Sequence, residues 1–267
     1  MLYASKSFTV EYPLSDANVC VLGVPFDSTS IAHPLQRYGP ALIRNALKHL
    51  HYYIPEKKRA FDLRVHDAGD VDVAPGSFEE TDRRVRDTVA SIVRQNPKAL
   101  LTVLGGEHSI TLPVVRELKP RTIVSFDAHP DLWESHEGVS YSHATWLYHA
   151  AKELNCEIVL LGVRATMPEV EKTMKKLGVK TKLPSKLKGP VYVTIDMDSF
   201  DPAYAPDTGF PEPNGFTPKE IFELIDRVFA SRVIGLDVTE VASDRFGNPT
   251  ANLAARTLLR CWSNITR

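Results

Sequence analysis

The feature that most constrains the fold is an alternation of short, almost wholly apolar runs with longer amphipathic segments. Apolar runs occupy residues 18–24, 99–104, 122–127, 157–161, 191–196 and 233–237, and a weaker, more polar strand is expected at residues 65–71. Helix-like segments occupy residues 39–50, 78–94, 110–118, 144–154, 168–177, 217–229 and 252–262. Strands that are apolar throughout are typical of parallel sheets with both faces covered by helices. The pattern predicts an α/β fold, a three-layer α/β/α sandwich with an open, mainly parallel sheet; a closed eight-fold barrel is the alternative.

The sequence indicates a single domain over residues 1–267. It contains no internal repeat, no low-complexity tract and no Gly/Ser linker. The proline-rich loop at residues 199–216 is too short and too aromatic for a flexible tether. A chain of 267 residues can bury a substantial core within one large domain.

Charge, hydropathy and cysteine content argue against several classes of protein. Lys and Arg total 32 against 33 for Asp and Glu, which argues against a general nucleic-acid binder or a binder of anionic membranes. No apolar run approaches the roughly 20 residues of a membrane helix, and residues 1–14 lack the apolar core of a signal peptide. The three widely spaced cysteines are typical of reduced thiols. We therefore expect a cytoplasmic protein with neither nucleic acid nor membrane as partner.

Four polar segments follow directly after four predicted strands. They are GGEHSI at residues 105–110, DAHPD at 127–131, DMDSFD at 196–201 and DVTE at 237–240. In an open parallel sheet, ligands bind outside the carboxyl ends of the strands. A single acidic residue after a strand usually caps a helix or starts a turn. Four such segments at one edge instead predict a shared functional site.

The spacing of these residues predicts a metal centre. Acidic and histidine residues recur at every second position in two of the segments, so an extended backbone would point them the same way. The four aspartates carry a charge of −4, which two divalent cations would neutralise. A set of carboxylates and histidines without cysteine favours a hard ion such as manganese over structural zinc. The candidate ligands are His108, Asp127, His129, Asp131, Asp196 and Asp198.

The motifs GGEHSI, SFDAHPD, SHATW, TIDMDSFDPAYAPDTGFPEPNGFT and DVTEV, in this order, closely resemble those of the ureohydrolase (arginase/agmatinase) family. The resemblance covers nearly the whole chain, including QRYGPALIR near the N-terminus. The long DMD…DPAYAP…PEP motif and the glutamate of GGEHS resemble agmatinases more than arginases. The resemblance implies an arginase-like fold, a binuclear manganese centre and hydrolysis of agmatine to putrescine and urea.

The resemblance also implies a role for each matching residue. His108, Asp127, Asp131 and Asp196 would hold one Mn²⁺, and His129, Asp127, Asp196 and Asp198 the other. Asp127 and Asp196 would bridge the two ions, which activate water as the nucleophile. Glu240 matches the carboxylate that pairs with the guanidinium, His143 the histidine that shuttles protons, and Asp131 can relay a proton to the leaving amine. The family usually forms trimers or hexamers, which implies a homo-oligomer.

Acidic residues in the rim loops predict how the far end of the substrate is recognised. No Lys or Arg lies between Arg121 and Lys152 or between Lys188 and Lys219. Such a rim suits the ammonium tail of a guanidine such as agmatine. The candidate tail-binding residues are Glu134, Glu137 and Asp207, whereas Arg37 and Arg245 are the cations that could reach the mouth.

Two alternatives to an agmatinase remain open. The substrate could be arginine, a guanidino acid or a formimino compound, because Asp207 and the segment DRFGN at residues 244–248 depart from the usual agmatinase pattern. A non-catalytic metal-binding protein on the same fold would release no urea, so urea release separates it from every enzyme in the family.

Overall fold

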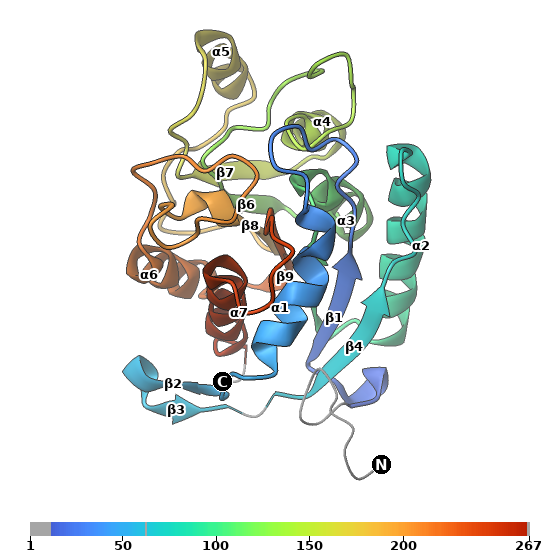
Figure 1. Cartoon of the computed structure of the whole chain (residues 1–267), viewed down its shortest axis with the longest axis vertical. Helices are drawn as coiled ribbons and strands as arrows, with labels where there is room; N and C mark the ends of the chain where they lie inside the picture. The colour runs from blue at the N-terminus through green and yellow to red at the C-terminus, as the bar shows by residue number, and fades with distance from the viewer. Residues whose placement is uncertain (1–11, 62, 266–267) are drawn as a thin grey trace.

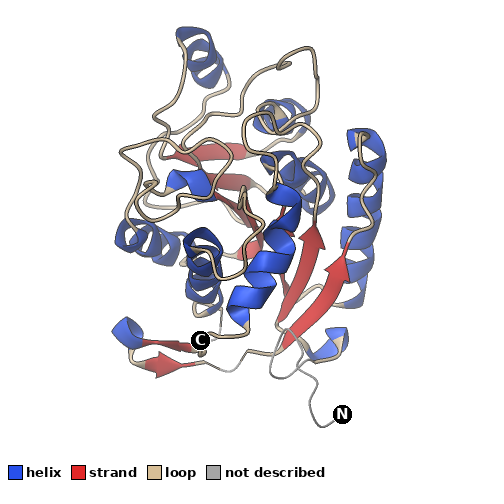
Figure 2. Ribbon diagram, in the orientation of Figure 1, coloured by secondary structure: helices blue, strands red, loops and turns tan. Residues whose placement is uncertain are grey.

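The computed structural model describes residues 12–61 and 63–265. Residues 1–11, which carry most of the segment considered above as a signal peptide, lie outside these ranges. A seven-stranded sheet runs through the molecule in the order β4-β1-β5-β9-β8-β6-β7, with every pairing parallel (Figures 1 and 2). The strands are β1 Val19–Val24, β4 Val65–Asp70, β5 Leu100–Gly105, β6 Thr122–Phe126, β7 Glu157–Leu161, β8 Val191–Asp196 and β9 Val233–Thr239.

Helices cover both faces of this sheet, as Figure 1 shows. They are α1 Gly39–Leu47, α2 Phe78–Gln95, α3 Thr111–Leu118, α4 Trp146–Glu153, α5 Pro168–Lys176, α6 Pro218–Val228 and α7 Pro249–Trp262. One apolar core joins α1, α6 and α7 to one face, and a second joins α2, α3, α4 and α5 to the other. The predicted three-layer sandwich is confirmed, and the barrel is wrong because the sheet ends at two edge strands, β4 and β7.

The burial of the strands explains why their sequences are apolar at successive positions. Every residue of β1, β5, β6 and β8 is buried, since side chains on both faces meet helices. Local signals fix the helix starts. The Ser77 hydroxyl accepts a hydrogen bond from the Glu80 backbone N–H at the start of α2, and Thr217 and Glu220 form a reciprocal capping box at α6.

Two differences from the sequence prediction have local causes. Helix α7 begins at Pro249 rather than near residue 252, because Asn248 caps it by accepting a hydrogen bond from the Ala251 backbone N–H at 2.7 Å. A separate two-stranded sheet, β2 Tyr53–Ile54 and β3 Arg59–Ala60, was not predicted, because two-residue strands leave no periodic pattern. In the described ranges, no helix combines the length and apolarity needed to cross a membrane.

Candidate active site

The four polar segments follow four strands that are direct neighbours in the sheet, β5, β9, β8 and β6. Residues 106–110 follow β5, residues 127–131 follow β6, Met197–Ser199 follows β8 as a single 3₁₀ turn, and Glu240 follows β9. Their side chains therefore converge at the carboxyl edge of the sheet centre, where open parallel sheets bind ligands.

The backbone reaches this arrangement differently from the prediction. Strand β6 ends at Phe126, so the segment from Asp127 to Asp131 is a loop rather than extended strand. Asp131 adopts the left-handed conformation with φ of 51°, and the Asp127 side chain accepts a hydrogen bond from the His129 backbone N–H at 2.6 Å. The expected alternation in extended backbone is wrong, although the side chains still meet.

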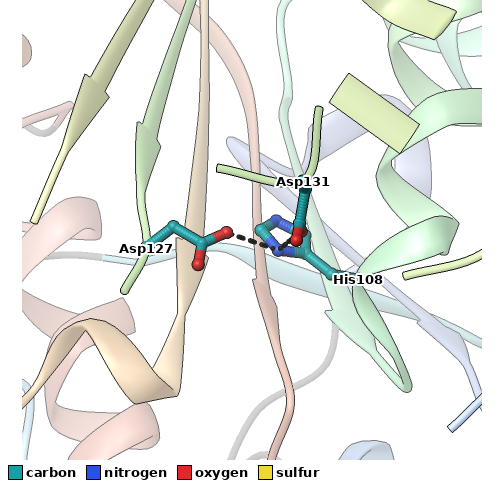
Figure 3. Close-up of side chains that lie close together, drawn as sticks. All are labelled: His108, Asp127 and Asp131. Carbon is teal, nitrogen blue, oxygen red and sulfur yellow. Dashed lines mark ion pairs between the residues drawn. The ribbon is translucent and has the colours of Figure 1, made fainter. Parts of the chain in front are cut away.

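A first cluster surrounds His108. Its Nδ1 lies 3.0 Å from Asp127 Oδ2, 3.2 Å from Asp131 Oδ2 and 3.1 Å from Asp196 Oδ2. Figure 3 shows the Asp127 and Asp131 carboxylates approaching the same edge of the imidazole ring. All four side chains are buried, so three carboxylates crowd one ring nitrogen within the protein interior.

A second cluster surrounds His129 and shares one member with the first. His129 Nδ1 lies 2.8 Å from Asp198 Oδ2 and 3.8 Å from Asp127 Oδ1. Asp127 therefore turns one oxygen to each histidine, as a carboxylate between two ions would do. The spacing of donor atoms in both groups, His108–Asp127–Asp131 and Asp127–His129–Asp198, suits a bound metal ion.

Hydrogen bonds behind His108 show that its Nδ1 suits a cation. Asp237 is fully buried and accepts hydrogen bonds from the hydroxyls of Thr194 and Thr111. Because Thr194 gives its one proton to Asp237, its oxygen accepts from His108 Nε2–H, 2.7 Å away. Burial lowers the pKa of His108, but the Asp127, Asp131 and Asp196 carboxylates beside Nδ1 favour a proton there and raise the pKa well above its usual value. A cation bound at Nδ1 would take the place of that proton. Among the described residues, His108 Nδ1 and Asp127 Oδ2 are buried atoms without a hydrogen bond, as expected for atoms reserved for a metal.

The pKa shifts of the buried aspartates also indicate a metal site. Burial raises the pKa of Asp127 to about 7, and the charges of Asp131 and Asp198 add to the shift. Burial also raises the pKa of Asp196, again with Asp198 and Asp127 contributing. Without a cation, these carboxylates must hold protons that ordinary aspartates release. A divalent ion would take the place of those protons.

Glu240 lies beside the first cluster in a strained backbone conformation, with φ of 64°. Its Oε1 accepts a hydrogen bond from the His108 backbone N–H at 2.7 Å, and its Oε2 accepts one from Gln36 Nε2 at 2.9 Å. Burial raises the pKa of Glu240 to about 8, while the Gln36 hydrogen bond opposes the shift. Left-handed backbone at a non-glycine residue costs about 1–3 kcal/mol and clusters at functional sites. Gln36 was not predicted as a site residue, although it belongs to the QRYGP segment.

His143 lies in the loop between β6 and α4 and faces the same cavity. Its Nδ1 is 3.3 Å from the hydroxyl of Thr29, in the loop after β1. Its ring stacks on Phe210 with centroids 6.3 Å apart and lies 5.9 Å from the ring of His136. Burial lowers the pKa of His143. The imidazole is therefore neutral at neutral pH and can accept or return a proton.

A cavity of about 400 Å³ opens above these groups. His108, Asp131, Asp196, Asp198, His129 and Glu240 line its floor, and Trp133, Met167 and Phe210 are among the apolar residues of its walls. Within the part of the chain that the structure describes, its lining includes no Lys or Arg. His136 and Glu212 also line it. His136 belongs to none of the motifs, whereas Glu212 lies in the PEP motif but was not among the candidate tail-binding residues.

The structure does not bring the three predicted tail-binding acids to this cavity. Glu134 lines a separate hollow with Tyr148 and Lys152, and Glu137 is exposed on a turn. Asp207 pairs with Arg245, at 3.2 Å between Oδ1 and the guanidinium. Of the described residues, the acid in the outer part of the cavity is instead Glu212, 4.0 Å from His129 Nε2. Arg37 pairs with Asp27 at 2.7 Å and is also outside the lining.

The fold and the site define an α/β protein with a carboxylate and histidine cluster at the carboxyl edge of its sheet. Residues 17–262 match the model of the arginase family, and the chain belongs to that family. It is 37% identical over 275 residues to an agmatinase of Pyrococcus horikoshii, covering 97% of this chain and 96% of that protein. It is also 37% identical to an N(1)-aminopropylagmatine ureohydrolase of Thermococcus kodakarensis, covering 96% and 95%. The crystal structure of agmatine ureohydrolase of Thermoplasma volcanium superposes with a TM-score of 0.85 at 29% identity, covering 95% and 91%.

Proposed function

We propose that this protein is a metal-dependent agmatinase, which hydrolyses agmatine to putrescine and urea. The observation that carries the proposal is the composition of the cavity. Side chains that could bind metal ions lie at its floor together with Glu240, and among the described residues its lining includes no Lys or Arg. The agmatinases and agmatine ureohydrolase among its relatives support the same substrate. Urea release from agmatine by the manganese-loaded protein is the direct test.

The six clustered side chains fit two metal ions. His108, Asp127, Asp131 and Asp196 would hold one, and His129, Asp127, Asp196 and Asp198 the other, with manganese suited to this oxygen-rich set. Bound ions would supply the activated water that attack on a resonance-stabilised guanidinium carbon requires at neutral pH.

The other residues of the floor orient the substrate and move protons. The Glu240 carboxyl group, fixed by Gln36 and the His108 backbone N–H, would ionise when it pairs with the guanidinium, whose positive charge offsets the effect of burial, and would set the position of the guanidinium carbon. The carbon–nitrogen bond to the alkyl chain breaks, so the leaving amine must gain a proton. The Asp131 carboxylate can take a proton from the attacking water, and the neutral His143 imidazole can accept that proton and pass it to the leaving amine.

The relatives include a second candidate substrate. The Thermococcus kodakarensis relative is named for N(1)-aminopropylagmatine, which carries an additional aminopropyl chain. The apolar walls formed by Trp133, Met167 and Phe210 could hold such an extension. Both agmatine and N(1)-aminopropylagmatine would release urea, so urea release alone does not distinguish them. The ratio of their kcat/KM values decides which is the better substrate.

We predict that kcat/KM for agmatine exceeds that for arginine by at least about a hundredfold, since two or three kcal/mol of mismatch suffices. Arginine would place a carboxylate against the outer wall, where Glu212 is an acid and the described lining offers no Lys or Arg. An unpaired charge in a closed site costs several kcal/mol. Steady-state rates on agmatine, arginine and 4-guanidinobutyrate measure the ratio. A better rate on either carboxylate-bearing compound would contradict the substrate assignment.

We predict about two manganese ions per chain after reconstitution, as in binuclear sites where one carboxylate lies between two ions. Elemental analysis of the dialysed protein measures the number. Chelation should remove both the metal and the activity, and added manganese should restore both. One tightly held ion with full activity would contradict the paired site.

We also propose that the protein acts in the cytoplasm as a homo-oligomer. The three cysteines are free and either buried or half-buried, which supports a reducing compartment such as the cytoplasm. The family resemblance supports a homo-oligomer, a trimer or hexamer, of single-domain chains spanning residues 1–267. Sedimentation analysis would measure the assembly size.

A further inference from the structure

Glu107 is a fully buried acid next to the site that the proposed reaction does not use. Its Oε1 accepts hydrogen bonds from the hydroxyls of Thr29 and Ser109, at 2.7 and 2.6 Å. Its Oε2 accepts one from the Thr29 backbone N–H at 2.7 Å, and the Ser30 hydroxyl is 3.5 Å away. In each of these contacts the partner group is a hydrogen-bond donor and Glu107 is the acceptor. Among the described residues, no Lys or Arg pairs with Glu107. Burial raises the pKa of Glu107, and the hydrogen bonds from Ser109 and Thr29 oppose that shift. Because each contact is a donor at hydrogen-bond distance, the geometry stabilises the ionised carboxylate.

Close backbone packing brings Glu107 and Thr29 together from distant parts of the sequence. Gly106 packs against the loop after β1, where an added Cβ would lie 2.0 Å from the Phe26 carbonyl oxygen. The Glu107 backbone N–H donates to that same carbonyl at 2.7 Å. The end of β5 is therefore held against the loop that carries Thr29, and the position of the Thr29 hydroxyl is fixed.

The proton count at the Thr29 hydroxyl determines which nitrogen of His143 is protonated. This hydroxyl has one proton, which it gives to the Glu107 carboxylate. Its oxygen then acts as the acceptor for the His143 backbone N–H at 3.2 Å and for His143 Nδ1 at 3.3 Å. Nδ1 must therefore carry the proton of the neutral ring. Nε2 is left with its lone pair, on a side chain that lines the cavity.

We propose that Glu107 and Thr29 are positioning residues that hold His143 in its Nδ1–H tautomer, so that Nε2 is the nitrogen that exchanges protons with the substrate. The inference rests on the proposed function for its catalytic consequence, but the tautomer itself does not depend on the substrate. Neither residue touches the reacting atoms; both act through the orientation of the imidazole. A wrong tautomer can cost a hydrolase several orders of magnitude in rate.

Three variants separate this role from a merely structural one. Thr29→Val keeps the shape of the side chain and removes the hydroxyl, whereas Thr29→Ser restores the hydroxyl. Ser30→Ala is the matched control, because Ser30 contacts Glu107 but makes no described contact with His143. We expect Thr29→Val to lower kcat at least about tenfold with KM for agmatine changed less than about threefold, because proton transfer is affected more than binding. Thr29→Ser and Ser30→Ala should remain near the wild-type rate.

The ring tautomer is measured directly by ¹⁵N nuclear magnetic resonance on histidine-labelled protein loaded with zinc, which is diamagnetic. The wild type and Thr29→Ser should show His143 with a protonated Nδ1 and a bare Nε2, and Thr29→Val should lose this preference. A protonated Nε2 in the wild type would overturn the proposal, whatever the variants do. So would a Thr29→Val protein with unchanged kcat and unchanged tautomer. Failure of the wild type to release urea would instead refute the proposed function and leave the tautomer measurement decisive for this inference.

Discussion

Replacing Asp127 by asparagine is expected to lower kcat/KM by at least about a thousandfold, roughly 4 kcal/mol, with the fold retained. Asp127 is almost fully buried and turns one oxygen to His108 and the other to His129. Asparagine has nearly the same size, but its side chain carries no charge to share between two ions. The variant should therefore lose metal as well as turnover.

The measurement combines metal content, kinetics and thermal unfolding. Asp87→Asn is the matched control. It makes the same chemical change as Asp127→Asn, but at an exposed residue on the surface of α2. We expect the control to retain metal and activity, and both variants to unfold cooperatively. An Asp127→Asn protein that holds a full complement of metal and remains active would show that the ligand assignment is wrong.

Replacing His143 by alanine is expected to lower kcat by about 10²–10⁴, the usual range for general acid–base catalysis. The ring lines the cavity, burial lowers its pKa, and it is not among the six candidate metal ligands. The variant should therefore keep its metal content. Loss of the ring leaves the departing amine without its proton donor.

Rates and metal content of His143→Ala should be compared with those of His49→Ala, whose histidine is exposed just after α1. Added imidazole should partly restore the rate of the His143 variant, because it can occupy the space of the missing ring. An unchanged kcat would show that His143 is not the proton carrier.

The fold was predictable because β1, β5, β6 and β8 are buried on both faces. Continuous apolar runs such as residues 191–196 are typical of strands whose two faces are both covered, and each of them is a strand of the main sheet. The convergence of the acidic segments was predictable for the same reason, since parallel strands end at one edge. Their order in the sheet was not, because residue spacing carries no information on which strands are neighbours.

The details of the site depended on contacts that sequence spacing does not encode. The six candidate ligands were identified, but by assuming extended backbone where the chain turns at Asp131. The tail-binding acids were chosen by their distance along the sequence from the ligands, and two of them, Glu134 and Asp207, make contacts outside the cavity. Gln36 and Thr29 reach Glu240 and His143 from more than 100 residues away, across the close packing of two strand ends.

The central claim is that this cavity hydrolyses agmatine with the help of bound metal. The most direct measurement is the release of urea and putrescine from agmatine by protein loaded with manganese, beside the same protein after chelation. We predict equal amounts of the two products from the loaded protein and neither from the chelated one. Release of ammonia instead of urea, or no product from agmatine by fully loaded and folded protein, would contradict the account.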